Sequence, residues 1–367
     1  MACRTGYLGI DINKDVGTGF RPVQAGKGAS KTRLHRYVFV SSYIFDPALP
    51  LAEQALIERI RRRLKTRTPA MVAGVGDDCA VLRIPPGHEA LVTTDFSLEG
   101  IHFRREWHPP ESVGHRCLAR GLSDIAAMGG EPIAAFLSLA LPGKLPQSWV
   151  DRFVEGLLRL AKESGIVLAG GDTAESPAGV LADIVVLGSA PKGTAILRSG
   201  ARPGDRIYIT GELGAAAATL NLLFTGKRLR PFDHRRHFFP SARLDAGRLL
   251  RQKRLASAMI DISDGLSTDL AHICEESGVG AEIEREAIPV AQAGRPRRPV
   301  DISFALHGGD DYELLFTAPP QKRIRARIGG IPVTEIGRIR RGRRIFLRNV
   351  EGSLAELRPQ GWEHFRA

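Results

Sequence analysis

Short apolar runs alternate with helical patterns along most of the chain after residue 50. Apolar and β-branched runs bounded by glycine, proline or charged residues predict strands. These runs lie at 91–94, 133–140, 183–187, 206–210, 259–262, 313–317, 333–339 and 344–347. Apolar positions that recur every three or four residues predict helices. They lie at 111–128, 147–164, 213–224, 241–253 and 266–277, and a further arginine-rich helix begins near Leu51.

Glycine, proline and charged residues cluster near residue 192, which predicts a boundary between two domains. The cluster includes Pro191 and the segment RSGARPG at 198–204. A length of 367 residues fits two domains, since one domain has about 100–200 residues. We predict an N-terminal domain at 47–192 and a C-terminal domain at 193–367. Strands and helices occur in similar amounts, which predicts an α/β or α+β fold.

The formal net charge is +12, and by itself it favours a nucleic-acid partner. Residues 1–46 hold seven Lys/Arg and three Asp/Glu without periodicity, which predicts a basic, disordered extension. The other basic stretches, at 59–67, 227–254 and 322–348, carry no zinc motif and no interleaved aromatic platform. We interpret them as solvated faces, and we predict no nucleic-acid partner.

Features of membrane and secreted proteins are missing from the sequence. No apolar stretch approaches the about 18 residues of a membrane span, and residues 1–30 lack the apolar core of a secretory signal. The four cysteines are scattered without a CxxC pair, which argues against a disulfide framework or a zinc ribbon. The sequence therefore predicts a cytoplasmic protein that does not bind membranes.

Aspartates recur beside glycines at the ends of the predicted strands. They occur in GDD (76–78), TTD (93–95), GGDT (170–173), DISDG (261–265) and GGDD (308–311), and Asp124 lies within an apolar helix. A carboxylate in such surroundings is costly to desolvate unless a cation or donor is near. Carboxylate and hydroxyl oxygens without Cys/His pairs suit Mg²⁺ or Mn²⁺. Taken singly, Asp264 fits a helix cap, Asp172 fits a turn with Thr173, and Asp124 fits a helix-surface acid.

Several common catalytic motifs are missing. The sequence has no GxxxxGK[ST] phosphate loop, no protein-kinase HRD or DFG motif, no GxGxxG and no GxSxG. A phosphate site built from aspartates and metal ions fits the sequence better than any of these.

Seven motifs, taken in order, resemble those of the thiamine-monophosphate kinase family. They are GVGDDCAVL (74–82), TTDFSLEGIHF (93–103), LSDIAAMGGEP (122–132), GGDT (170–173), RSGARPGD (198–205), IDISDGLSTDL (260–270) and GGDDYELLF (308–316). The ending GWEHF (361–365) is also similar. The resemblance covers about residues 50–365 and implies a two-domain, aminoimidazole-ribonucleotide-synthetase-like ATP-binding fold, with N-terminal strands pairing across a homodimer. It implies transfer of phosphate from ATP to thiamine monophosphate, giving thiamine diphosphate.

The resemblance also implies three groups of site residues. Several Mg²⁺ ions would be bound by Asp78, Thr93, Thr94, Asp95, Asp124, Asp172, Asp261 and Asp264. ATP would contact Gly171, Asp172, Arg198 and Ser263, and thiamine monophosphate would contact His102, Asp310 and Trp362. The acceptor phosphate, with a second pKa of about 6, is largely deprotonated at pH 7, so no catalytic general base is predicted.

Some assignments have ordinary alternatives. Gly121 stands where family members often have Asn, and Asp310 stands where many have Glu. Arg198 and His102 also fit loop residues without a ligand, and Trp362 fits a core anchor. Another enzyme of the same superfamily, such as selenophosphate synthetase, hydrogenase-maturation carbamoyl dehydratase or a purine-pathway synthetase, and a non-catalytic basic binding protein remain open at this point.

Overall fold

The computed structural model describes residues 53–64, 68–75, 78–293, 297–362 and 365. The predicted extension at 1–46 lies outside the described residues. Residues from Asp46 onward cluster as one compact unit, so the boundary predicted near residue 192 stays a prediction. No helix among the described residues has both the length and the apolar character to cross a membrane.

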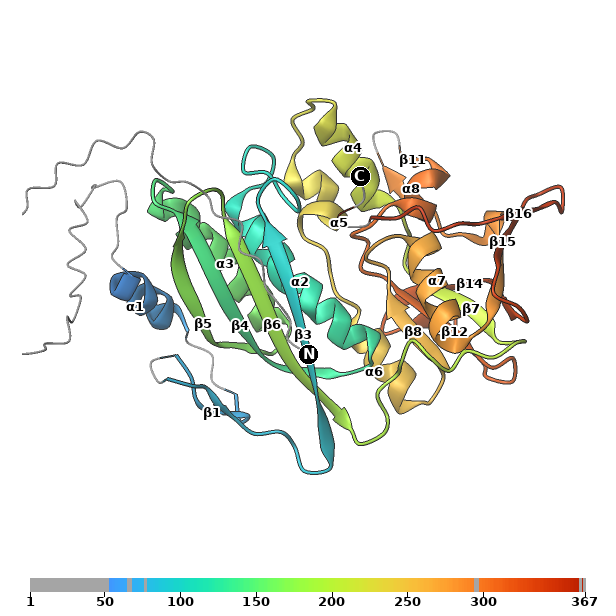
Figure 1. Cartoon of the computed structure of the whole chain (residues 1–367), viewed down its shortest axis with the longest axis horizontal. Coiled ribbons are helices and arrows are strands. Elements are labelled where there is room, and N and C mark those ends of the chain that lie inside the picture. Colours follow the sequence, from blue (N-terminus) through green and yellow to red (C-terminus); the bar gives the residue numbers. More distant parts are fainter. Residues whose placement is uncertain (1–52, 65–67, 76–77, 294–296, 363–364, 366–367) are drawn as a thin grey trace, which may run out of the picture. The chain divides into compact units, whose positions relative to one another are not determined.

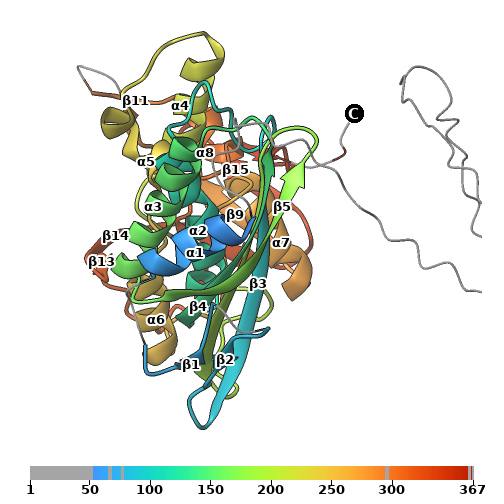
Figure 2. The ribbon, with the colours of Figure 1, turned by 90° about the vertical axis from the view of Figure 1, so that its left-hand side faces the viewer.

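The first sheet has four strands in the order β3-β6-β4-β5. These strands are β3 (His88–Leu98), β6 (Leu181–Pro191), β4 (Glu131–Pro142) and β5 (Val167–Ser176). β6 pairs antiparallel with both β3 and β4, whereas β4 and β5 run parallel. Two helices, α2 (Pro110–Ala127) and α3 (Gln147–Glu163), pack on one face of this sheet (Figure 2). Helix α1 (Glu53–Arg63) and the short strands β1 (Met71–Ala73) and β2 (Val81–Leu82) precede it.

The second sheet has eight strands and follows in the chain. Its order is β16-β15-β9-β14-β7-β12-β8, and β13 pairs with β14. Its strands are β7 (Arg206–Thr210), β8 (Ala258–Asp261), β9 (Gly280–Glu284), β12 (Leu314–Ala318), β13 (Arg327–Ile328), β14 (Ile331–Arg340), β15 (Ile345–Arg348) and β16 (Leu354–Glu356). The helices of this half are α4 (Ala215–Phe224), α5 (Arg235–Phe238), α6 (Leu244–Gln252), α7 (Leu266–Ser277) and α8 (Ile302–His307). Two single turns, η1 (Pro231–His234) and η2 (Arg285–Ala287), and the strand pair β10 (Gln292–Ala293) and β11 (Arg298–Pro299) complete it.

Helix α2 lies between the two sheets (Figure 1). It is buried along almost its whole length, because one side packs on β3 and β6 and the other side meets β8 and α6. A helix that is buried on both sides can carry polar side chains only where hydrogen-bond or ionic partners lie next to them. Helix α2 therefore determines which polar residues of the two halves come together.

The apolar patterns located most elements correctly. Strand β7 and helix α7 have the predicted bounds, and the other predicted strands and helices differ only at their ends. Strand β9 was missed because it begins with glycine and carries Glu282, which is buried beneath Arg338, Arg340 and Arg348. Strand β5 was missed because its second half is the polar segment GGDTAES.

Replacing Glu282 with glutamine is expected to lower the free energy of unfolding by about 1–2 kcal/mol, because buried Glu282 loses its charged hydrogen bonds while the three arginines stay partly solvated. Urea unfolding followed by circular dichroism measures this. Glu155→Gln is the control, since it breaks only an exposed pair with Arg159, worth less than about 1 kcal/mol. Equal losses in the two variants would contradict the prediction.

Candidate active site

Three of the predicted metal-binding aspartates meet at α2. Side chains alternate along β3, so Thr93 and Asp95 both face the helix. The Thr93 hydroxyl donates a hydrogen bond to the Asp124 carboxylate. Asp261, at the end of β8, accepts a hydrogen bond from the Ser123 hydroxyl at 2.6 Å. Acids from both halves of the chain thus meet where strand β3, helix α2 and strand β8 come together. We call these acids the carboxylate cluster: Asp95, Asp124 and Asp261.

The electrostatics of the carboxylate cluster are unfavourable without a cation. Burial, and then the nearby charge of Asp124, raise the pKa of Asp95 to about 6. The same two causes raise the pKa of Asp261 to about 7. Burial also raises the pKa of Asp124, although the Thr93 hydrogen bond and the charge of Arg198 oppose the rise. Carboxylates that repel one another in a buried site need compensating positive charge.

Three loops meet beside the cluster. The amide of Asp310 donates to the carbonyl oxygen of Ser263 at 2.8 Å, and the amide of Trp362 donates to that of Asp264 at 3.2 Å. Gly309 permits this approach, because a Cβ there would lie 2.3 Å from the Ser263 oxygen. The structure therefore places Asp310 beside Ser263 and Trp362 beside Asp264.

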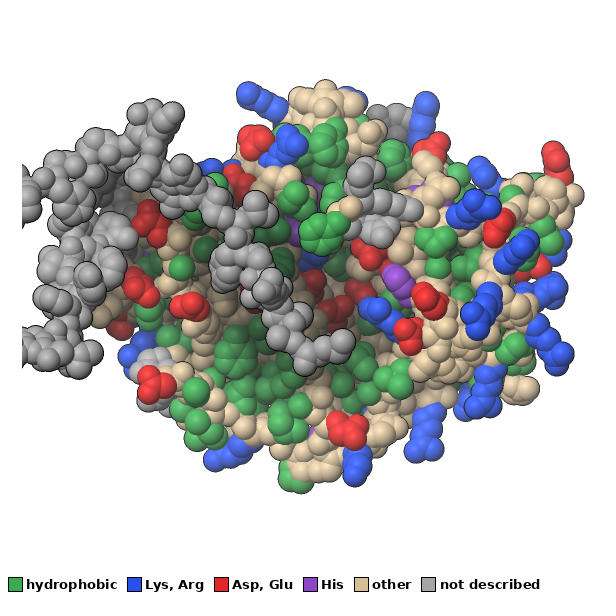
Figure 3. Space-filling model, viewed as in Figure 1, with side chains coloured by type: hydrophobic (Ala, Val, Ile, Leu, Met, Phe, Trp, Pro, Cys, Tyr) green, Lys and Arg blue, Asp and Glu red, His purple; other side chains and the backbone are tan. Residues whose placement is uncertain are grey.

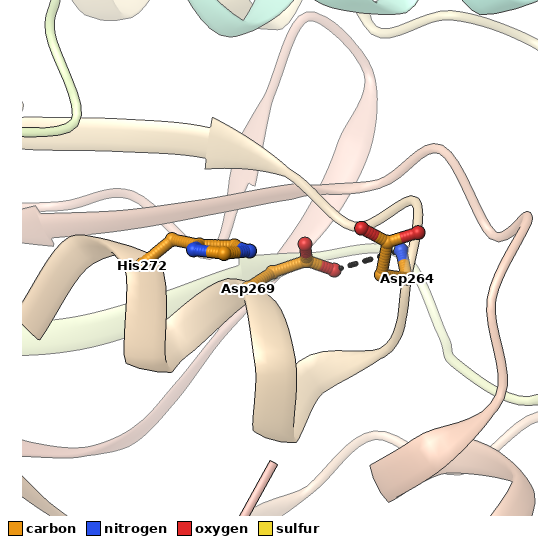
Figure 4. A group of neighbouring side chains, drawn as sticks. All are labelled: Asp264, Asp269 and His272. Carbon is orange, nitrogen blue, oxygen red and sulfur yellow. Dashed lines mark hydrogen bonds between the residues drawn. The ribbon is translucent and has the colours of Figure 1, made fainter. Parts of the chain in front are cut away.

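A group of three side chains, Asp264, Asp269 and His272, lies at the start of α7 (Figure 4). Their possible ligand atoms all lie within 4.8 Å of one another, a spacing that suits a single cation. One carboxylate oxygen of Asp269 accepts from the amides of Ser263, Asp264 and Gly265. Asp269 thus fixes the turn that leads into α7, whose N-cap position is Gly265, and the cap interpretation of Asp264 stays a prediction.

Asp269 was missed by the sequence analysis. It lies in the recognised segment IDISDGLSTDL as the fourth residue of α7, and it reaches back to the amides before the helix much as the acid of a capping box does. Its function is to fix the shape of the loop that holds Ser263 and Asp264.

Replacing Asp269 with alanine is expected to lower the free energy of unfolding by about 2–4 kcal/mol, because backbone amides lose their acceptor. Thermal unfolding measures the loss. Asp301→Ala is a matched control, since Asp301 caps the short helix α8 through Ser303 alone and costs about 1 kcal/mol. A loss for Asp269→Ala no larger than this control would contradict the role assigned to Asp269.

Asp310 is already held by protein groups. Arg116 donates to one carboxylate oxygen at 2.8 Å, and the Tyr312 hydroxyl donates to the other at 2.6 Å. Burial works against ionisation, but Arg116 and Arg120 hold the pKa of Asp310 well below its usual range. Asp310 and Tyr312 both have positive φ, so the backbone is strained at this loop. Its contact with substrate stays a prediction.

Other predicted residues lie apart from the carboxylate cluster. Thr94 faces the opposite side of β3, where its hydroxyl donates to Asp183 at 2.7 Å. Asp172 lies on that same side of the sheet and accepts from the Thr173 amide at 2.9 Å, but both residues belong to strand β5, so the turn interpretation was wrong. Asp78 lies in the exposed loop between β1 and β2. Metal binding by Thr94, Asp172 and Asp78 stays a prediction.

The remaining predicted residues have distinct environments. Gly171 has a φ of 154°, and a Cβ there would lie 1.9 Å from the Leu137 carbonyl oxygen, so β5 needs glycine at this point. His102 follows β3, and its Nδ1 accepts from the Leu98 amide at 3.0 Å. Trp362 is 55% exposed, so the core-anchor alternative was wrong. Arg198 is exposed in the loop before β7, and its charge lowers the pKa values of Asp124 and Asp261.

Two family models match most of the described chain. "AIR synthase related protein, N-terminal domain" matches residues 76–190, and "AIR synthase related protein, C-terminal domain" matches residues 202–348. The thiamine-monophosphate kinase of Salmonella typhimurium is 38% identical over 302 residues, which are 78% of this chain and 90% of that protein. The chain belongs to the thiamine-monophosphate kinase family.

Solved structures of the family agree with the fold. The crystal structure of thiamine-monophosphate kinase from Stenotrophomonas maltophilia is 36% identical, with a TM-score of 0.73, and the match covers 83% of this chain and 98% of that one. The structure "AaThiL complexed with AMPPCP and TMP" is 34% identical, with a TM-score of 0.67, over 86% of this chain and 98% of that one. The predicted two-domain fold of mixed α/β type is thereby confirmed.

Proposed function

We propose that this chain transfers the terminal phosphate of ATP to thiamine monophosphate, giving ADP and thiamine diphosphate. The observation that carries the proposal is the carboxylate cluster, which lies where the two halves of a thiamine-monophosphate kinase fold meet. The test is the purified protein with ATP, Mg²⁺ and thiamine monophosphate, followed by chromatography of thiamine diphosphate. Folded protein that forms no product would overturn the proposal.

The residues of the carboxylate cluster fit magnesium. Its ligand atoms are carboxylate oxygens with a threonine hydroxyl alongside, and the elevated pKa values of Asp95 and Asp261 mark negative charge that lacks compensation. We propose that Asp95, Asp124 and Asp261 hold Mg²⁺, and that Asp264 holds a further ion with His272 beside it. Bound Mg²⁺ neutralises the charge of polyphosphates and holds them in line.

We propose direct in-line transfer, in which an oxygen of the acceptor phosphate forms a bond to the terminal phosphorus of ATP. The bond from that phosphorus to the bridging oxygen breaks, and its electron pair leaves with ADP. The acceptor needs no general base, since its phosphate is largely deprotonated at pH 7. Accumulation of phosphorylated enzyme without acceptor would contradict direct transfer.

The side chains around the cluster suggest how the two substrates are oriented. Arg198, close enough to lower the pKa of Asp124, is proposed to bind phosphates of ATP together with Gly171, Asp172 and Ser263. Trp362 is largely exposed beside the Asp264 loop, which supports stacking on a cationic thiazolium ring. His102, Asp310 and the remaining predicted metal ligands keep the roles that the family resemblance implies.

We infer that the protein is a cytoplasmic homodimer. On the face of the first sheet opposite α2 and α3, strand β3 exposes two large apolar side chains beside Thr94: Val92 is 67% and Phe96 54% exposed. Hydrophobic side chains gather over β3 and β6 on this face (Figure 3). An exposed apolar face on long strands favours a second copy as partner. Sedimentation of the wild type and of Phe96→Glu tests this, and a wild type that stays monomeric at micromolar concentration would overturn it.

A further inference from the structure

Three side chains of α2 lie on one face because they are four residues apart: Arg116, Arg120 and Asp124. Asp124 belongs to the carboxylate cluster. Arg116 is fully engaged, since one of its amino groups donates to the carbonyl oxygen of His237 and the other donates to Asp310. Arg120 lies between these two neighbours, and its closest ion pair among the described residues is a loose one with Asp95, 3.7 Å from its Nε.

The surroundings of Arg120 point to a missing anion. Its side chain is only 19% exposed, and its buried Nε has no hydrogen-bond partner among the residues that the structure describes. The nearest carboxylate oxygen belongs to Asp95 and lies 3.7 Å away, beyond hydrogen-bond range. A buried guanidinium with an unpaired N–H is costly, and a bound anion would remove that cost.

Metal binding would make this imbalance larger. Asp95 is the closest counter-ion of Arg120, yet it is also one of the acids proposed to hold Mg²⁺. Asp310, the next acid, already pairs with Arg116 and Tyr312. When the cluster holds its cation, Arg120 therefore faces positive charge on one side and a satisfied carboxylate on the other. A phosphate between them supplies the charge and the acceptor atoms that a planar guanidinium needs.

We propose that Arg120 binds the phosphate group of thiamine monophosphate and orients it toward ATP. This inference rests on the proposed function. The acceptor is favoured over ATP because Arg120 lies one helical turn from Arg116, which holds Asp310, a residue predicted to contact thiamine monophosphate. The sequence analysis missed Arg120, because the sequence does not distinguish it from the other arginines of this basic chain.

Steady-state kinetics of Arg120→Gln test the proposal. We expect the KM for thiamine monophosphate to rise by about 10–100-fold, because charge-assisted hydrogen bonds to its phosphate are lost. We expect the KM for ATP to change by less than about threefold. Arg120→Lys, which keeps the charge, should recover part of the loss. The control is Arg251→Gln on α6, because Arg251 is also a buried arginine but donates to Gly129, Glu131 and Thr194, away from the carboxylate cluster. An unchanged KM for thiamine monophosphate, or equal rises for both substrates, would overturn the proposal.

Binding without turnover separates this inference from the proposed function. Calorimetry with Mg²⁺ compares thiamine monophosphate with thiamine, which lacks the phosphate. We expect the wild type to prefer thiamine monophosphate and Arg120→Gln to lose most of that preference. If the wild type makes no thiamine diphosphate but shows this pattern, the proposed function fails and the role of Arg120 stands. If the wild type is active and Arg120→Gln keeps the full preference, only the role of Arg120 fails.

Discussion

Replacing Asp124 with asparagine is expected to lower kcat/KM for thiamine monophosphate by about 1000-fold, or about 4 kcal/mol of transition-state stabilisation. Asp124 accepts from Thr93, and its charge acts on both Asp95 and Asp261, so it is central to the carboxylate cluster. Asparagine keeps the size and shape of the side chain but removes the charge that holds a divalent cation. Product formation at saturating ATP and varied thiamine monophosphate measures the loss.

The same substitution is expected to stabilise the metal-free protein. Asp124 raises the pKa values of its two neighbours, so its removal relieves repulsion in the buried cluster. We expect a higher melting temperature than the wild type in EDTA, combined with the loss of activity. Asp245→Asn is the control, because Asp245 is exposed on α6 and should change neither quantity. Activity of Asp124→Asn within tenfold of the wild type would remove Asp124 from the site.

Stabilisation by Mg²⁺ is expected to grow from pH 5 to pH 8. The folded pKa values of Asp95 and Asp261, about 6 and about 7, lie above the unfolded value of about 3.9. Between these values the folded protein binds more protons than the unfolded chain, so these groups make the metal-free protein less stable as pH rises. For Asp95 alone, a shift of about two units corresponds to about 3 kcal/mol, which a bound cation would offset above pH 7.

Thermal unfolding with MgCl₂ or with EDTA, at constant ionic strength, measures this difference at each pH. The comparison is needed because His108 acts in the opposite direction: its pKa is lowered to about 4, so stability rises as pH increases from about 4 to 6.5. That contribution is present with and without Mg²⁺ and cancels in the difference. A Mg²⁺-induced shift in melting temperature that is equal at pH 5 and pH 8 would contradict metal binding at Asp95 and Asp261.

Much of the fold was predictable because its elements bury one regular face. Helix α7 and strand β7 follow simple apolar periods and were located correctly. Strand β9 could not be located in this way, since Glu282 interrupts its apolar pattern and is stabilised by arginines from β14 and β15. A polar residue of this kind becomes compatible with a sheet interior through partners that are distant in sequence.

The sequence by itself determined the chemistry of the site. Aspartates beside glycines at strand ends, in a recognisable order, predicted hard-metal and phosphate binding, because the side-chain types limit which ligands can bind. Tertiary structure decided which of them act together. Thr94 and Asp95 are neighbours in the chain, yet they face opposite sides of β3, and only Asp95 meets Asp124. The role proposed for Arg120 also depends on tertiary structure, because its unpaired Nε–H results from the packing of α2 between two sheets.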